Sequence, residues 1–203
     1  MKNKIICFDL WQTLIYSGGQ GRASYENMLT ELGVARDKIY TYVRDNLMSR
    51  QLTYREMVAA LLKYFDLKSS DSLIKRLKSA WVTDNGQVAW FDEAIAVLRN
   101  LKQEQAKLVL VTNTTLPGWL AVESKLKVSQ YFDHLFLSWQ EGISKPNQIV
   151  WRRVQSWFPD TQPENFLMIG DNQDDDLAMP KKMGWNVKLV NKDGNNLTEI
   201  VER

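Results

Sequence analysis

Two short apolar segments of the sequence each run directly into an aspartate. Residues 5–8 precede Asp9, and residues 166–169 precede Asp171 with only a glycine between them. Four consecutive apolar residues are typical of a strand that is buried on both faces, as in a parallel sheet. Ligands of open α/β sheets bind outside the carboxyl ends of the strands. Both aspartates are therefore predicted to lie where such a sheet does chemistry.

The two carboxylates suggest a metal-assisted reaction. Carboxylates at adjacent strand ends repel each other unless a cation lies between them, and hard oxygen ligands suit Mg²⁺. Asp171, with help from Asp175 or Asp176, is predicted to hold this ion, which would also offset the charge of an anionic substrate. Asp9 can then present its second oxygen as a nucleophile and form a covalent ester or acyl phosphate that water later breaks.

Two further polar residues follow predicted strands. Thr112 comes directly after residues 107–111, and Lys145 lies in the loop region after residues 134–138. The Lys145 ammonium is predicted to place a compact positive charge beside the nucleophile and beside the oxygens of a transferred phosphoryl group. Thr112 and the backbone N–H groups of the Asn113–Thr114 turn are predicted to bind the remaining oxygens.

The elements that must position these residues follow an alternating order. Predicted helices over residues 93–101, 117–126 and 147–157, and one ending at Gly184, separate the predicted strands, and a last strand is predicted at residues 187–190. Alternating strands and helices predict an α/β fold, with a mostly parallel sheet and helices on both faces. The four candidate residues should then converge on one rim of the sheet.

A helical segment interrupts this alternation after the first strand. Residues 17–21 read Ser-Gly-Gly-Gln-Gly, a break that is typical of a connection between two packing units. From about residue 22 to Gly86, apolar residues recur at helical spacing in four groups, without a convincing strand. The segment is predicted to be an all-helical insertion.

Composition limits the classes of function. With 203 residues, 44% of them hydrophobic and 25% charged, and a formal charge of +2, the chain is predicted to be an ordinary globular protein of one domain, with or without a smaller insertion. The basic residues are dispersed, which argues against nucleic acid, and nothing points to a membrane. Cys7 is the only cysteine, which favours a reducing compartment, and the N-terminal apolar run is too short for a signal peptide. We expect a cytoplasmic protein.

Four segments resemble, in order, the signature motifs of the haloacid dehalogenase-like hydrolase superfamily. They are residues 8–14, residues 111–113, residues 144–146, and residues 169–172 together with Asp176. The resemblance implies a Rossmann-like core formed by residues 1–16 and 87–203, and a helical cap formed by residues 17–86.

The resemblance also implies roles for individual residues. It makes Asp9 the nucleophile, and it makes Thr112 and Lys145 the residues that bind the transferred group. Asp171 becomes a Mg²⁺ ligand, and the backbone carbonyl of Trp11 becomes another. Asp9 and Asp176 complete the expected metal set, while Asn113 and the Trp11 side chain are expected at the substrate.

Trp11 departs from the pattern of the family's phosphatases. They carry a second aspartate two residues after the nucleophile, which protonates the leaving group and later activates water. The tryptophan side chain cannot exchange a proton near neutral pH. General acid/base catalysis typically raises the reaction rate ~10²–10⁴-fold. An ordinary alkyl phosphomonoester should therefore be hydrolysed poorly.

Three functions are compatible with this departure. The leading one is a Mg²⁺-dependent phosphohydrolase for a small anionic metabolite with a good leaving group, such as an acyl phosphate or a phosphoanhydride. The second is a 2-haloacid dehalogenase, because that branch has an aromatic residue at this position, although it lacks the aspartate represented here by Asp171. The third is a non-catalytic protein that binds a phosphorylated ligand or a partner. A monomer or homodimer is expected in each case.

Overall fold

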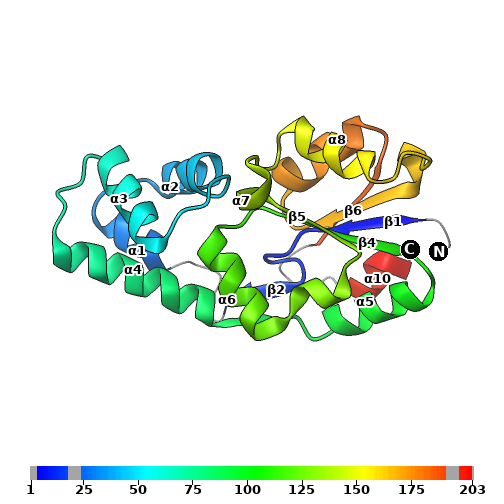
Figure 1. Ribbon diagram of the computed structural model, residues 1–203, viewed down its shortest axis with the longest axis horizontal. Helices are drawn as coiled ribbons and strands as arrows, with labels where there is room; N and C mark the ends of the chain where they lie inside the picture. Colours follow the sequence, from blue (N-terminus) through cyan, green and yellow to red (C-terminus); the bar gives the residue numbers. More distant parts are fainter. Residues whose placement is uncertain (1–3, 18–23, 191–196, 203) are drawn as a thin grey trace.

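A computed structural model of the chain describes residues 4–17, 24–190 and 197–202. The molecule is elongated, with a sheet and its covering helices at one end and a group of helices at the other (Figure 1). Most of the glycine-rich break predicted at residues 17–21 lies outside the described residues.

The larger sheet has five parallel strands in the order β5-β4-β1-β6-β7. They are β1 (Ile5–Phe8), β4 (Lys107–Thr112), β5 (His134–Leu137), β6 (Phe166–Gly170) and β7 (Asn186–Leu189). β1 is central, and its first residue, Ile5, pairs with Lys107 on one side and Phe166 on the other. The carboxyl ends of β1, β4 and β6 are therefore neighbours, and the predicted α/β class is confirmed.

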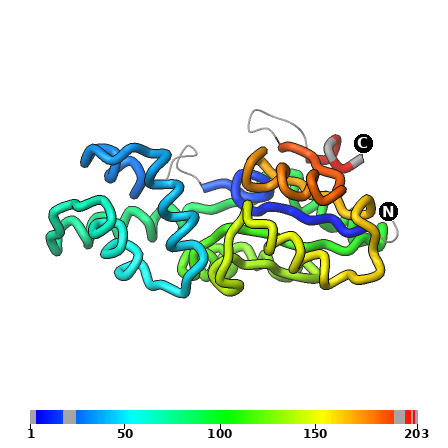
Figure 2. The backbone as a smooth tube through the Cα atoms, turned by 90° about the horizontal axis from the view of Figure 1, so that it is seen from above, coloured from blue at the N-terminus to red at the C-terminus, as the bar shows by residue number. Residues whose placement is uncertain are grey.

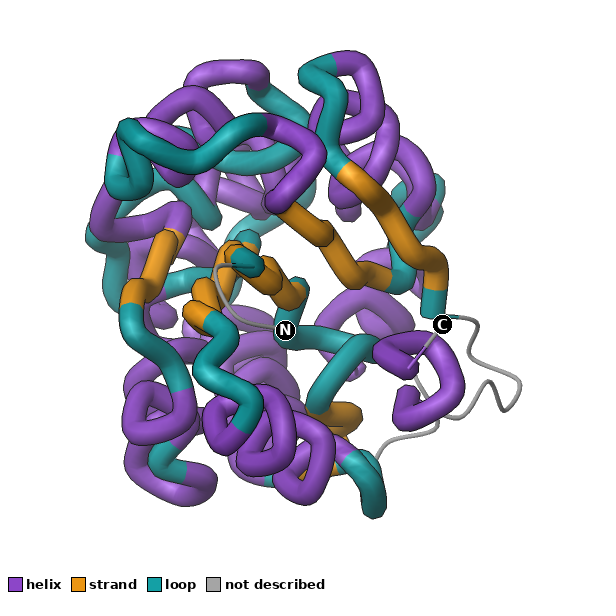
Figure 3. The backbone as a smooth tube through the Cα atoms, turned by 90° about the vertical axis from the view of Figure 1, so that its right-hand side faces the viewer, coloured by secondary structure: helices purple, strands orange, loops and turns teal. Residues whose placement is uncertain are grey.

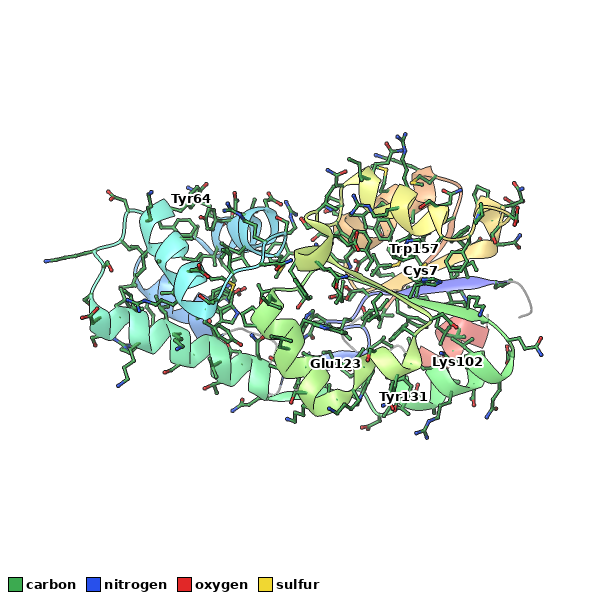
Figure 4. All side chains as sticks on the ribbon, viewed as in Figure 1. Cys7, Tyr64, Lys102, Glu123, Tyr131 and Trp157 are labelled. Atoms are coloured by element: carbon green, nitrogen blue, oxygen red, sulfur yellow. The ribbon has the colours of Figure 1, made fainter. Side chains whose placement is uncertain are left out.

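Helices cover both faces of this sheet, as Figure 3 shows. They are α5 (Ala94–Gln103), α6 (Leu116–Leu126), α7 (Ser138–Glu141), α8 (Gln148–Ser156), α9 (Ala178–Lys182) and α10 (Leu197–Glu202), with shorter turns η2 (Val128–Tyr131), η3 (Pro163–Asn165) and η4 (Gln173–Leu177). Ile6 and Phe8 pack in the cluster that includes Leu98 of α5, whereas Cys7 packs in the cluster that includes Trp151 of α8. Figure 4 labels Cys7 and Trp157 on this second face. Burial on both faces explains why β1 has no polar side.

The helical segment has its own apolar core. It comprises α1 (Ser24–Glu31), α2 (Arg36–Tyr42), η1 (Val43–Leu47), α3 (Tyr54–Tyr64) and α4 (Asp71–Gly86). Leu29, Ile39, Leu61 and Leu77 are fully buried in one cluster there. Local signals set the helix ends: Thr53 forms a capping box with Glu56, and the Ser70 side chain caps α4. Seen from above, these helices lie beside the sheet at the end of the molecule (Figure 2).

A second, two-stranded sheet was not anticipated. Antiparallel β2 (Ile15–Ser17) and β3 (Val88–Trp90) pair where the chain enters and leaves the helical segment. Three-residue strands are too short to show a period-two pattern in the sequence. A smaller difference concerns the helix predicted at residues 93–101, because α5 begins one residue later, at Ala94, with Glu93 as its N-cap.

None of the described helices combines the length and the apolar composition that a membrane crossing requires.

Candidate active site

Three carboxylates and one ammonium group meet at the carboxyl edge of the larger sheet. Asp9, Asp171 and Asp176 each offer a carboxylate oxygen, and these oxygens lie within 4.8 Å of one another. Lys145 Nζ lies 2.6 Å from Asp9 Oδ1 and 2.6 Å from Asp176 Oδ1. The order of the strands thus brings together groups that are far apart in the sequence, such as Asp9 and Lys145, which are 136 residues apart. The structure brings together four of the residues that the sequence singles out.

The main chain and one hydroxyl hold Asp9 in place. Its N–H donates to Ile169 O at 2.9 Å, which extends the β1–β6 pairing by one residue. Thr13 Oγ1 donates to Asp9 Oδ2 at 3.3 Å. Asp9 is 6% exposed and Lys145 is 2% exposed, so the ion pair lies almost entirely out of water. Burying an ion pair costs free energy unless both partners are well hydrogen-bonded. Buried charged groups in a cluster of this kind are typical of functional sites.

Asp176 is oriented by the turn that follows β6. Its Oδ2 accepts from the Asn172 N–H at 3.0 Å, while the Asn172 side chain accepts from the N–H groups of Asp174 and Asp175. The carboxylate passes so close to Gly170 that a Cβ added there would lie 2.4 Å from Asp176 Oδ2. Glycine at position 170 is therefore required for this approach.

Gly170→Ala is expected to lower the free energy of unfolding by about 1–3 kcal/mol, because an added methyl group must displace Asp176 in a packed site. Urea unfolding measures this change. Gly86→Ala is the matched control, since a Cβ there has nothing within 4 Å, and it should leave the stability unchanged or slightly higher. Equal stability of the two variants would show that the site tolerates the shift of Asp176.

Asn113 holds the loop that carries Lys145. Its Nδ2 donates to Lys145 O at 3.0 Å, and its Oδ1 accepts from Lys145 N at 2.8 Å. The side chain expected at the substrate is thus bonded to the lysine's main chain, although Asn113 also lines the cavity described below. The prediction that the Thr114 N–H is available to an anion is wrong, because this group donates to Ser138 Oγ at 2.9 Å.

Thr112 ends β4 with its side chain fully buried. Its Oγ1 has no hydrogen-bond partner among the described residues. An unsatisfied buried hydroxyl costs free energy, and such groups in native proteins commonly mark a place where a ligand or water completes the bonding. Thr112 itself does not belong to the residues that line the cavity.

Burial and like charges control the ionisation of the site. Burial, together with the nearby Asp176 and Asp171, raises the pKa of Asp9 to about 7, although Lys145 opposes this rise. Burial disfavours the charged form of Lys145, but Asp176 and Asp9 outweigh this and raise the pKa of the lysine. The lysine is therefore a fixed cation, whereas burial and the neighbouring carboxylates disfavour the charged form of Asp9.

A cavity of about 350 Å³ opens next to these groups. Its wall on the sheet side includes Asp9, Lys145, Asp171 and Asp176, and Trp11 also lines it. On the side of the helical segment, all the lining residues except one methionine are aromatic, acidic or amide-bearing. These residues are Tyr25, Glu26, Tyr40, Met48, Trp81, Asp84 and Asn85. The helical segment and the sheet thus enclose one space between them.

Side chains of the helical segment bind the sheet end directly. Tyr40 Oη donates to Asp175 Oδ2 at 2.5 Å, and Arg44 Nη1 lies 3.1 Å from Asp175 Oδ1. Ser138 Oγ donates to Met48 O at 2.6 Å. The sequence predicts Asp175 only as a helper for the metal. A lone tyrosine and a lone arginine on a helix give no signal of a contact with it.

Arg44→Ala is expected to speed amide exchange of residues 36–47 about tenfold, which corresponds to roughly 1.4 kcal/mol, because Asp175 is buried and loses a charged partner. Hydrogen–deuterium exchange measures it. Arg153→Ala, which breaks the Arg153–Glu141 pair elsewhere, should leave these residues unchanged. Unchanged exchange in both variants would mean that the Arg44 contact does not fasten the helices.

Comparison with known proteins points to one family. Residues 3–184 match the haloacid dehalogenase-like hydrolase family. The rhythmically expressed gene 2 protein of Drosophila melanogaster is 28% identical over 127 residues, which is 61% of this chain and 47% of the fly protein, so the match spans about half of that relative's length. The glyceraldehyde 3-phosphate phosphatase of Pyrococcus abyssi is 24% identical over 199 residues, 89% of this chain and 78% of that protein.

Solved structures have the same fold. A HAD family enzyme from Bacteroides thetaiotaomicron, in complex with magnesium and inorganic phosphate, superposes with a TM-score of 0.69 at 16% identity, covering 95% of this chain and 96% of that one. A predicted phosphoglycolate phosphatase from Haemophilus somnus gives a TM-score of 0.65 at 16% identity, covering 100% of this chain and 98% of that one. With nine-tenths of its length inside the family match, and with this arrangement of strands, the chain belongs to the haloacid dehalogenase-like hydrolases.

Proposed function

We propose that the protein is a magnesium-dependent phosphohydrolase that transfers a phosphoryl group from a small phosphorylated metabolite to Asp9. The single observation that carries the proposal is the Lys145 ammonium, bonded at 2.6 Å to both Asp9 and Asp176 at the edge of a cavity. Relatives named as phosphatases support the reaction class. We also propose that residues 17–86 act as a cap over this cavity, and that the protein works in the cytoplasm as a monomer or homodimer.

The donor set suits Mg²⁺. Three carboxylates within 4.8 Å of one another supply hard oxygen ligands. Burial and the neighbouring carboxylates raise the pKa of Asp9, and a bound cation would oppose this rise. Asp9, Asp171 and Asp176, with the backbone carbonyl of Trp11, would hold the ion. When bound, Mg²⁺ supplies positive charge that offsets the carboxylates and the phosphate of the substrate.

The residues of the chain account for two chemical steps. An Asp9 carboxylate oxygen attacks phosphorus, the bond from phosphorus to the leaving group breaks, and the leaving group departs with the electron pair. The Lys145 ammonium binds the phosphoryl oxygens during this transfer. The Thr112 hydroxyl, which has no hydrogen-bond partner among the described residues but does not line the cavity, is proposed to join it when the substrate is bound. Water then attacks phosphorus of the aspartyl phosphate, which releases phosphate and restores Asp9. Because Trp11 donates no proton, the leaving group must be stable as an anion.

Phosphate release from acetyl phosphate tests the proposal. We expect turnover in Mg²⁺, its loss after treatment with EDTA, and its recovery when Mg²⁺ is added back. Ethyl phosphate should be hydrolysed at least about 100-fold more slowly, since its alkoxide needs a proton. Equal rates on the two substrates would contradict the leaving-group argument, and no turnover of either would contradict the proposed reaction.

Trp11 also favours two other functions. A dehalogenase needs no general acid, because halide leaves without being protonated. Chloride release from 2-chloropropionate without metal would establish this function. A binding protein needs no acid at all, and it is favoured if no activated phosphate is hydrolysed. The presence of Asp171 in the carboxylate cluster supports the phosphohydrolase over both.

A further inference from the structure

Gln12 holds a backbone conformation that its residue type disfavours. Its φ is +60°, in the left-handed region where a side chain crowds the backbone, whereas glycine adopts this region without cost. The turn fixes this conformation, because the Gln12 N–H donates to Ile15 O at 2.7 Å and the N–H groups of Leu14 and Ile15 both donate to Leu10 O. Strained residues of this kind concentrate at functional sites, so a role for the Gln12 side chain is to be sought.

The side-chain amide of Gln12 is available to a ligand. Gln12 is partly buried and lines the cavity together with Asp9 and Trp11. No described residue forms a hydrogen bond with its amide. Three asparagines line the cavity as well, and each of their side chains is hydrogen-bonded within the protein. These pairs are Asn85 with Tyr54, Asn113 with the main chain of Lys145, and Asn172 with the N–H groups of Asp174 and Asp175.

The turn that carries Gln12 wraps around the proposed nucleophile. Thr13, the next residue, donates from Oγ1 to Asp9 Oδ2 at 3.3 Å. On the proposed function, Asp9 and Lys145 hold the phosphoryl group, and the leaving group departs into the cavity that Trp11 and Gln12 line. The indole of Trp11 donates no proton to it. A side-chain amide on the same turn offers a hydrogen bond to the departing group without transferring a proton.

A neutral amide suits an acyl leaving group better than a phosphate. A departing phosphate carries several negative charges that cations must offset. Of the lining residues that the structure describes, Lys145 is the only lysine or arginine, and it is already bonded to Asp9 and Asp176. The carbonyl oxygen of an acyl group accepts a hydrogen bond from a neutral amide. This bond strengthens as the acyl group becomes a carboxylate, because hydrogen bonds to charged acceptors are stronger.

We propose, resting on the proposed function, that Gln12 is a specificity-determining residue whose side-chain N–H donates to the carbonyl oxygen of an acyl phosphate. During transfer, the bond between phosphorus and the bridging oxygen breaks and its electron pair stays with the acyl group. The carboxylate that forms shares its charge with the oxygen that Gln12 contacts. It also needs no proton to depart, which agrees with Trp11. The site therefore takes acyl phosphates in preference to phosphoanhydrides.

Binding of two non-hydrolysable probes tests the contact without turnover. 2-Oxopropylphosphonate carries a methylene group in place of the bridging oxygen of acetyl phosphate, and propylphosphonate lacks its carbonyl group as well. In buffer with Mg²⁺, calorimetry should give a dissociation constant about fivefold lower for 2-oxopropylphosphonate than for propylphosphonate. Gln12→Met nearly keeps the size of the side chain and the backbone strain but removes the donor, so it should bring the ratio of the two constants close to one.

Gln12→Gly removes the amide and the backbone strain together. It should also bring the ratio close to one, while the midpoint of urea unfolding stays equal or rises. Gln105→Gly is the matched control, because Gln105 has a φ of +62° but is exposed and lies outside the cavity. It should have the same effect on the urea midpoint and keep the wild-type ratio of dissociation constants.

Four outcomes would overturn the inference. They are equal affinity of the wild type for the two probes, binding of neither probe, a ratio that stays at the wild-type value in Gln12→Met, and a urea midpoint of Gln12→Gly well below that of the wild type. The last outcome would show that the Gln12 side chain is kept for stability. Failure of the wild type to hydrolyse acetyl phosphate would contradict the proposed function instead, and it would leave the measured ratio of affinities as it is.

Discussion

Asp9→Asn is expected to lower kcat/KM for acetyl phosphate by at least about 10³-fold, as removal of a covalent nucleophile does in other hydrolases. The amide has the shape of the carboxylate, so the bonds from Thr13 and to Ile169 can persist. It cannot, however, form the aspartyl phosphate, and it weakens the charge that Lys145 and a metal would meet. Phosphate release under steady-state conditions measures the loss.

A neighbouring carboxylate provides the control for this variant. Asp174 belongs to the same acidic run as Asp176 but does not line the cavity, so Asp174→Asn should retain activity within about twofold. Urea midpoints of both variants establish that they fold. Activity of folded Asp9→Asn within tenfold of the wild type would exclude Asp9 as the nucleophile.

The convergence of Asp9, Asp171 and Lys145 could be predicted because one physical pattern fixes it. Buried apolar runs identify the strands, parallel pairing places their carboxyl ends together, and polar residues at those ends must then meet. The helical segment could be predicted equally well, because helical spacing and caps such as Ser70 are local signals.

The remaining contacts depend on how distant segments pack. The bonds of Asn113 to the main chain of Lys145 span 32 residues, and the bond from Tyr40 to Asp175 spans 135. No periodicity or cap encodes such pairs. The prediction that the Thr114 N–H binds an anion is wrong for the same reason. Its acceptor, Ser138, directly follows another strand, β5. Sequence pattern thus predicts the groups that we propose to react, whereas packing determines the residues that hold them.

Trp11→Asp is expected to raise kcat/KM for ethyl phosphate about 10²-fold, at the lower end of the typical contribution of a general acid. Trp11 lines the cavity beside Asp9, and its loop is held by a 2.7 Å bond from Gln12 N to Ile15 O. A carboxyl group on that loop can protonate the departing alkoxide and then take a proton from water. The gain should be smaller for acetyl phosphate, whose leaving group needs no proton.

Trp11→Asn separates proton transfer from the space that the indole leaves. The amide has nearly the size of the carboxyl group and opens the cavity equally, but it cannot exchange a proton at neutral pH. The ratio of kcat/KM for ethyl phosphate to that for acetyl phosphate should therefore rise in Trp11→Asp alone. If the ratio rises equally in both folded variants, the tryptophan limits the reaction by blocking the alkyl group, and the missing acid is not the reason for poor phosphomonoester turnover.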